Sequence, residues 1–189
     1  MGETYTYATK VTGDADGEMD MSLKAVKVDP DSVVLESRYL DAKRNGKSLP
    51  QTELGFLKSI VVTITEDRQG RPTNVEVKGA PGAVADQIKA QQSGTGVAYP
   101  NRPVKIGESW VTESTMQGKK VRLTYKLVKV GPVDGRDVAF LEATPDAGGL
   151  IKSEGPMTLS IDLATGMTIQ TKFSGEVSGK KVTVQMIRS

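Results

Sequence analysis

The residues best suited to chemistry in this chain are carboxylates and lysines, because it contains no cysteine and no histidine. This composition excludes thiolate nucleophiles, histidine acid–base catalysis, disulfides, and zinc or haem sites built on His or Cys. The densest acidic stretch, 13–20 (GDADGEMD), carries four carboxylates. Its spacing does not match an EF-hand loop, and strand alternation would send all four to the polar face of a hairpin. We therefore predict a solvated turn here and no metal site.

Two other patterns could support catalysis without histidine. Carboxylate pairs hydrolyse glycosides when they are held at a defined separation, but nothing in the sequence brings two together. Ser22 and Lys24 fall on one strand face, an arrangement that strands of this composition show by accident. We predict no catalytic residue, no cofactor and no enzymatic activity. A carboxylate-only hydrolase is the remaining catalytic alternative, and its candidate pairs are Glu3 with Glu108 and Glu36 with Glu142.

Length and charge limit the classes of partner. The 189 residues fit one domain with a core of its own, and 25 Lys+Arg against 23 Asp+Glu are interspersed along the chain. Without a basic stripe, we predict no nucleic-acid partner. No apolar run approaches the roughly 18 residues of a membrane span, so membrane contact would be peripheral at most. Strand-like Glu3–Tyr7 follows Met1-Gly2 directly, as if an export signal had been removed, and we expect a bacterial periplasmic or extracellular location.

Alternation of apolar residues with a period of two dominates the sequence and predicts β-strands. Any functional site must therefore be positioned mainly by strands. One segment, 82–92 (GAVADQIKAQQ), breaks the alternation and predicts a helix. The first predicted strands lie around Tyr5–Val11, Met19–Ala25, Val33–Tyr39, Ile60–Ile64 and Val75–Val77. The remaining six are predicted at about 108–116, 119–130, 136–144, 156–162, 166–176 and 180–188.

One strand sequence occurs twice, as Met21–Val28 (MSLKAVKV) and Leu123–Val130 (LTYKLVKV). Three further pairs of matching segments occur in the same order along the chain, which indicates a duplicated five-strand unit. Chance similarity between amphipathic strands is the alternative. These matches are GETY at 2–5 with GESW at 107–110, Leu35-Glu36-Ser37 with Leu141-Glu142-Ala143, and Gly70 and Gly79 with Gly166 and Gly175. We predict a single domain over 1–189, with one repeat at about 2–79, a helix and connector at 80–106, and a second repeat at 107–189.

Both copies change phase at the same place. Apolar positions are odd-numbered up to Ala25 and Leu127 and even-numbered from Val26 and Val128. Such a change predicts a β-bulge near 25–26 and 127–128, unless the strand is buried on both faces. Bulges bend strands sharply. The predicted fold is therefore mainly all-β, with about eleven antiparallel strands in a strongly curved half-barrel or barrel and one short helix.

Residues 103–110 (PVKIGESW) resemble a phrase in uncharacterised bacterial secreted proteins and lipoproteins, where a proline-containing loop precedes a Gly-Asp/Glu-Ser/Thr-Trp strand start. At the level of strand count and order, the chain resembles the half-barrel of bacterial lipoprotein carriers of the LolA/LolB type. That resemblance implies a curved sheet whose concave side encloses a cavity for acyl chains. This chain has one short predicted helix to serve as a lid.

Large apolar side chains share the inner faces of the predicted strands and can line a pocket for a lipid-like ligand. Their alternative role is to fill the core. One short helix covers little of a curved sheet, which favours a binding surface. We predict a non-catalytic exported module that binds an apolar or amphipathic small molecule or lipid. The alternative is an envelope scaffold or interaction domain that has a filled core and binds another envelope protein. The candidate ligand-binding residues are Tyr5, Tyr7, Met19, Met21, Leu23, Trp110, Leu123, Tyr125, Ile161 and Phe173.

Overall fold

The computed structural model describes residues 2–14, 16–92, 97–116 and 119–189. This part of the chain forms thirteen strands and two helices. The helices are α1 (Gln51–Ser59) and α2 (Gly82–Gln92). The strands are β1 (Thr4–Gly13), β2 (Gly17–Val28), β3 (Ser32–Arg44), β4 (Lys47–Ser48), β5 (Val61–Asp67), β6 (Pro72–Lys78), β7 (Ser109–Met116), β8 (Lys119–Val133), β9 (Arg136–Asp146), β10 (Ile151–Ser153), β11 (Met157–Asp162), β12 (Thr168–Val177) and β13 (Lys180–Arg188).

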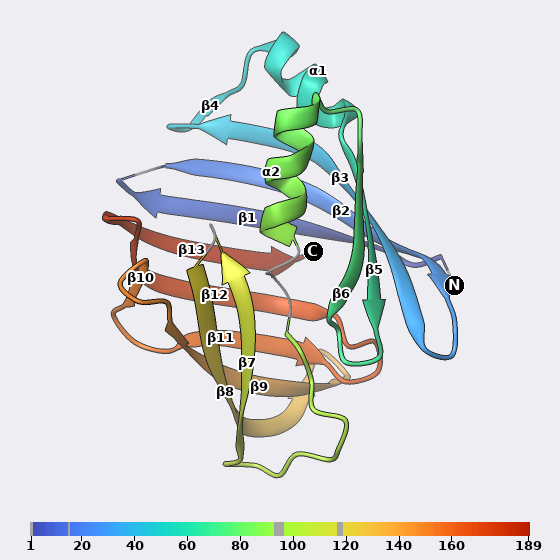
Figure 1. Cartoon of the computed structure of the whole chain (residues 1–189), viewed down its shortest axis with the longest axis vertical. Coiled ribbons are helices and arrows are strands. Elements are labelled where there is room, and N and C mark those ends of the chain that lie inside the picture. Colours follow the sequence, from blue (N-terminus) through green and yellow to red (C-terminus); the bar gives the residue numbers. More distant parts are fainter. Residues whose placement is uncertain (1, 15, 93–96, 117–118) are drawn as a thin grey trace.

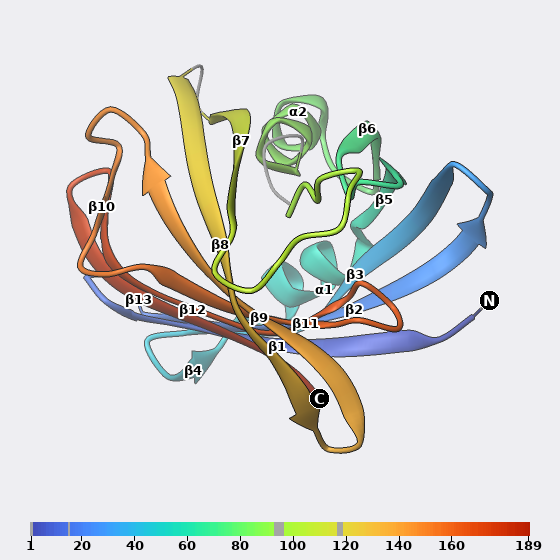
Figure 2. The ribbon, with the colours of Figure 1, turned by 90° about the horizontal axis from the view of Figure 1, so that it is seen from below.

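All thirteen strands belong to one antiparallel sheet that curves without closing. Its order is β6-β5-β3-β2-β1-β13-β12-β11-β9-β8-β7, with β4 paired to β3 and β10 paired to β12. The first and last parts of the chain therefore meet in the middle of the sheet, where β1 pairs with β13. Figure 2 shows both helices on the concave side of the sheet, and Figure 1 shows α2 between the edge strands β6 and β7. The half-barrel expected from the sequence is confirmed.

The eleven strands of the main path are those that alternation predicts, and the helix at 82–92 is confirmed as α2. Two short strands, β4 and β10, are additional. The expectation of a single helix was wrong, because α1 spans Gln51–Ser59. This helix has no buried residue, contains Gly55 and begins after Pro50, whose carbonyl accepts the Leu54 N–H at 2.9 Å. A nine-residue helix without a buried face leaves little periodicity to detect.

The two predicted β-bulges are present. In the β2–β3 pair the register shifts between Ala25 and Lys27, and in the β8–β9 pair it shifts between Leu127 and Lys129. Both lysines are exposed, which excludes a strand buried on both faces. Beyond each bulge, the partner of Val28 is Val33 and the partner of Val130 is Ala139. The two strand pairs thus bend at matching positions and steepen the curvature of the sheet.

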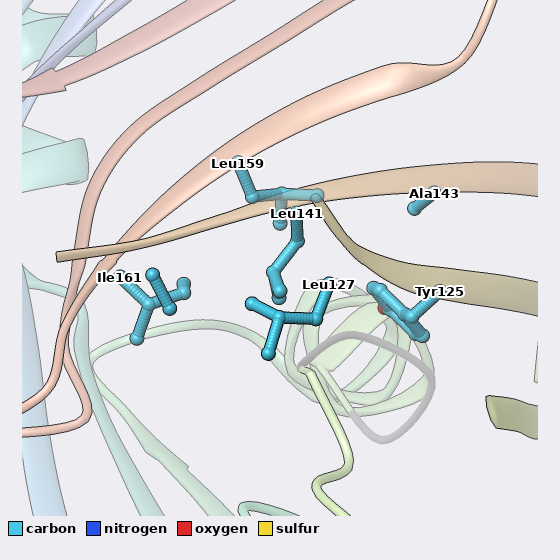
Figure 3. Close-up of a cluster of buried hydrophobic side chains, with 7 residues drawn as sticks. Tyr125, Leu127, Leu141, Ala143, Leu159 and Ile161 are labelled. Atoms are coloured by element: carbon cyan, nitrogen blue, oxygen red, sulfur yellow. The ribbon is translucent and has the colours of Figure 1, made fainter. Parts of the chain in front are cut away.

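Two separate hydrophobic clusters lie on the concave face. The β8–β11 cluster consists of Tyr125, Leu127, Ala139, Leu141, Ala143, Leu159 and Ile161. Figure 3 shows the side chains of this cluster, with Tyr125, Leu127, Leu141, Ala143, Leu159 and Ile161 labelled. The β5 cluster consists of Ile60, Val62 and Ile64. The connector residues Val97, Tyr99 and Val104 cover the first cluster, whereas Leu57 of α1 and Ile88 of α2 cover the second.

Candidate functional site

A cavity of about 330 Å³ lies between the two clusters. Its floor comes from β1, β2, β3 and β13, one wall from β5, and another from the segment 97–99. Residues directly opposite in an antiparallel pair share a face, which brings several inward side chains together. The apolar lining consists of Tyr7, Met21, Leu23, Leu35, Tyr39, Val62, Ile64, Val97, Tyr99, Met167 and Met186. The polar residues that line it are Ser22, Ser37, Glu66, Gln92 and Thr168.

The position of this cavity follows from the packing of the helices. The main contacts of α1 are with β3, and those of α2 are with β6. The middle strands β1, β2 and β13 therefore present their inward side chains to the cavity rather than to a helix. An apolar sheet face must be covered by something, so the cavity marks the part of the concave surface that the chain leaves open.

Glu66 is the acidic side chain of the cavity lining. Along β5, Val62, Ile64 and Glu66 occupy alternate positions and all three line the cavity. A register shift in the β5–β6 pair falls between Thr65 and Glu66, and it places Pro72 opposite Glu66. Burial raises the pKa of the Glu66 carboxyl to about 7, and the neighbouring Asp67 adds to the increase.

Tyr99 separates the cavity from a larger open cleft. This cleft has a volume of about 550 Å³ and lies between the β5–β6 turn and β7. Tyr99 lines both spaces, its N–H donates to the Gln69 carbonyl at 2.7 Å, and its hydroxyl donates to the Gly166 carbonyl at 3.4 Å. On the cleft side, the Trp110 indole N–H donates to the Ala98 carbonyl at 2.9 Å. Hydrogen bonds thus fix the wall segment 97–99 from both sides.

Gly70 allows the wall segment to approach the β5–β6 turn. Its φ is +73°, and an added Cβ would lie 2.8 Å from the Val97 carbonyl oxygen and 3.5 Å from the Tyr99 ring. We expect Gly70→Ala to lower the free energy of unfolding by about 2–3 kcal/mol in urea titrations, because positive φ costs about 1–2 kcal/mol and the contact adds to it.

Gly46→Ala provides the matched control for this substitution. Its φ is +72°, but nothing lies within 4 Å of the added Cβ. Conformational strain alone should therefore cost about 1–2 kcal/mol at Gly46. Equal losses in the two variants would mean that the wall segment does not press on Gly70.

A buried ion pair lies behind one end of the cavity. The Arg188 guanidinium contacts the Asp162 carboxylate at 3.0 Å, and the two side chains are 3% and 6% exposed. Tyr7, which lies opposite Arg188 in the β1–β13 register, lines the cavity and donates its hydroxyl to the Thr168 carbonyl at 3.1 Å. Burial raises the pKa of Tyr7 to about 12, so the phenol is neutral at ordinary pH. The ion pair itself is not part of the cavity lining.

The ten residues expected to bind a ligand lie in several places. Tyr7, Met21 and Leu23 line the cavity. Trp110 and Leu123 line the open cleft, and Trp110 stacks on Tyr125 with ring centroids 5.5 Å apart. The others lie outside the cavity lining: Tyr125 and Ile161 in the β8–β11 cluster, Tyr5 over Arg188, Met19 in a small depression between β2 and β3, and Phe173 opposite Val184. A role of any of them in binding stays a prediction.

Two aspartates of the acidic stretch accept backbone hydrogen bonds. The Asp14 and Asp16 carboxylates accept the backbone N–H groups of Lys181 and Gly13, each at 2.9 Å. In the described ranges, no three His, Cys, Asp or Glu side chains gather as a metal site would require. Within the same ranges, no helix is long and apolar enough to cross a membrane.

The carboxylates considered for hydrolysis have local partners. The Glu3 side chain accepts the Tyr5 hydroxyl, and Glu108 pairs with Arg102 at 2.5 Å. Glu36 accepts the Arg38 guanidinium N–H at 2.8 Å. These contacts give the three carboxylates surface roles.

Sequence reasoning found three residues of the cavity lining and missed the others, among them Glu66 and Tyr99. The signal for Glu66 was present, because the alternation of Ile60, Val62 and Ile64 continues to a carboxylate on the same face. Tyr99 lies in a proline-containing connector, where no periodicity shows which way a side chain points. A charged residue in phase with a buried strand face is therefore the signal that could have located the site.

Comparisons with known proteins give matches among solved structures alone. No protein-family model matches the chain, and no curated protein matches it. The Pseudomonas aeruginosa MucA/MucB complex matches with a TM-score of 0.38 and 17% identity, over 99% of this chain and 52% of that chain. MucB in complex with MucA(peri) matches with a TM-score of 0.37 and 15% identity, over 98% of this chain and 50% of that one. The chain thus spans about half the length of these solved chains.

Proposed function

We propose that this chain is a non-catalytic binding module that holds an apolar or amphipathic, lipid-like ligand in the cavity between the two clusters, in the periplasm or outside the cell. The supporting observation is the cavity of about 330 Å³ with a mainly apolar lining. This volume lies at the lower end of the roughly 300–1,000 Å³ range of small-molecule sites. A single alkyl chain is therefore the best match in size and chemistry.

A bound ligand would complete the packing of the concave face by covering apolar side chains that the chain leaves open. Apolar surface removed from water contributes about 25 cal/mol per Å². Met21, Met167 and Met186 line the cavity, and methionine side chains adapt to guests of different shape. An alkyl chain in the cavity would contact Val62 and Ile64 of the β5 cluster, and Val97 and Tyr99, which cover the β8–β11 cluster.

A protein-interaction domain is the second candidate. It is favoured by the open sheet edge at β7, where Val111 is 51% exposed and lines the cleft of about 550 Å³. An extended segment of another envelope protein could pair with such an edge. A lipid-like ligand would occupy the cavity, whereas a segment of another protein would occupy the cleft beside β7.

Filling the cavity is expected to abolish ligand binding. Met21→Trp places an indole in the cavity, and we expect it to lower the affinity for decanol at least about tenfold in isothermal titration calorimetry. Leu40→Trp is the matched control, because Leu40 is 40% exposed on the same sheet and is not part of the cavity lining.

Native mass spectrometry of the purified protein provides the independent readout, with a co-purified amphiphile expected in wild type and absent from Met21→Trp. Circular dichroism establishes that both tryptophan variants are folded. If decanol bound wild type and Met21→Trp equally well, the cavity would not be the binding site. Absence of binding to any amphiphile would leave the interaction domain as the better proposal.

A further inference from the structure

The charge pattern of the cavity is one-sided. Its lining includes the carboxyl group of Glu66, but no lysine or arginine of the described residues contributes to it. The other polar residues of the lining are Ser22, Ser37, Thr168, Gln92 and three tyrosines, none of which carries a positive charge. A ligand that entered with a carboxylate or phosphate head would therefore meet a carboxyl group and no cation.

Two arginines beside residues of the cavity lining have acidic partners. Arg71 pairs with Asp67 at 2.7 Å, and its side chain is 61% exposed. Arg188 pairs with Asp162 behind Tyr7. Neither arginine lines the cavity. Both are therefore poorly placed to neutralise an anionic head group.

Glu66 itself has an unused hydrogen-bonding capacity. Over the described ranges, no hydrogen bond or ion pair joins its carboxyl group to another residue, and the ionisable groups that act on it are Asp67 in its own strand and Tyr99 across the cavity. Burial raises the pKa of both Glu66 and Tyr99, so the phenol is neutral and offers no positive charge. A buried carboxylate without a partner is costly, and a donor brought by a ligand would lower that cost.

We infer that the cavity selects single-chain amphiphiles with a primary ammonium head group, with the Glu66 carboxylate as the acceptor in a mainly apolar cavity. This inference rests on the proposed function and adds the class of ligand. The alkyl chain lies against Met21, Leu23 and Leu35, while the ammonium group donates hydrogen bonds to Glu66. Ammonium–carboxylate contacts are charge-assisted and stronger than those of an alcohol.

The test compares three ligands that share one alkyl chain: decylamine, decanol and decanoate. Calorimetric titrations at pH 8 use wild type, Glu66→Gln and the control Glu76→Gln, which alters an exposed glutamate on the neighbouring strand β6. For wild type we expect decylamine to bind at least about tenfold more tightly than decanol, and decanoate to bind most weakly. Glu66→Gln should reduce decylamine binding to the level of decanol, whereas Glu76→Gln should preserve the wild-type order.

The outcomes separate this inference from the proposed function. Equal binding of the three ligands, or tighter binding of decanoate, would overturn the selectivity while leaving a lipid-binding module in place. A preference for decylamine that persists in Glu66→Gln would also overturn the role of Glu66. Failure of all three ligands to bind wild type would contradict both proposals. Because the comparison within wild type needs no substitution, the inference can fail even if a variant does not fold.

Discussion

Replacing Arg188 by methionine is expected to lower the free energy of unfolding by about 3–5 kcal/mol, measured by urea denaturation at pH 7. The substitution leaves the Asp162 carboxylate buried, at 6% exposure, without its cation. It also removes the guanidinium from the face of the Tyr5 ring, 4.9 Å from its centroid. A buried charge that loses its partner retains the full cost of its desolvation, which makes this a large effect.

Two variants show whether burial of the pair causes the loss. Lys152→Met breaks the pair with Glu176, in which the side chains are 66% and 32% exposed, and should cost less than about 1 kcal/mol. The double variant Arg188→Met with Asp162→Asn removes both charges but keeps an acceptor for the Ala164 N–H, which is 3.0 Å from Asp162. It should recover much of the loss, because Arg188 Nη1 has no hydrogen-bond partner in the described structure and the native pair is incompletely satisfied. Equal losses for Arg188→Met and Lys152→Met would contradict the assignment.

The ion pair also predicts how stability changes in acid. Burial alone would raise the pKa of Asp162, but hydrogen bonds from Arg188 and the Ala164 N–H outweigh burial and hold the pKa below its usual value. The contribution of the pair is therefore fully present above the ordinary aspartate pKa of about 4 and is lost as pH falls through the lower folded-state value.

Glu66→Gln should stabilise the protein by about 2–3 kcal/mol at pH 8 and have little effect at pH 5, measured by urea denaturation across this range. The folded-state pKa of Glu66 is about 7, raised from a usual value of 4.5. Between these two values the folded state binds more protons than the unfolded state, so wild-type stability falls as pH rises. Glutamine removes the charge that must be buried in wild type at high pH.

Glu76→Gln serves as the control for this pH dependence. Glu76 lies on the exposed side of β6, within the same β5–β6 pair. Its substitution should leave the slope of stability against pH unchanged. If Glu66→Gln had the same effect at pH 5 and pH 8, the carboxyl group would not be held in an apolar surrounding, and its assignment as the acceptor in a mainly apolar cavity would be wrong.

The architecture could be predicted from the sequence because its determinants are local and periodic. The alternation of Met21, Leu23 and Ala25 assigns an inward face, and the change of phase at Val26 predicts the bulge that the structure contains, although Val26 and Val28 are 41% and 56% exposed. The same pattern at Leu127 and Val128 gives the second bulge. Strands and bends follow from neighbours in the sequence, so one chain is sufficient to infer them.

The cavity could not be located from sequence periodicity. Its limits depend on which inward side chains are covered by residues from other parts of the chain. Met21 and Ile161 both point inward, yet one borders empty space and the other is 2% exposed in the β8–β11 cluster. The difference comes from the connector, whose Val97, Tyr99 and Val104 pack against the β8–β11 cluster and leave the cavity beside Val97 and Tyr99 open. Alternation shows on which face of the sheet a side chain lies. Whether other residues cover that side chain depends on the path of the connector, which has no periodicity.

The central position of β13 has a consequence for how the protein is made. Lys180–Arg188 pairs with both β1 and β12, so the two halves of the sheet are joined only after β13, which follows the other described strands in the sequence, has been synthesised. Until then a nascent chain holds two half-sheets with unpaired inner edges, and such edges invite aggregation. The β1–β13 pairing also has a very large sequence separation, which favours slow folding on the millisecond-to-second scale. A molecular chaperone that shields these edges during synthesis would therefore raise the yield of native protein.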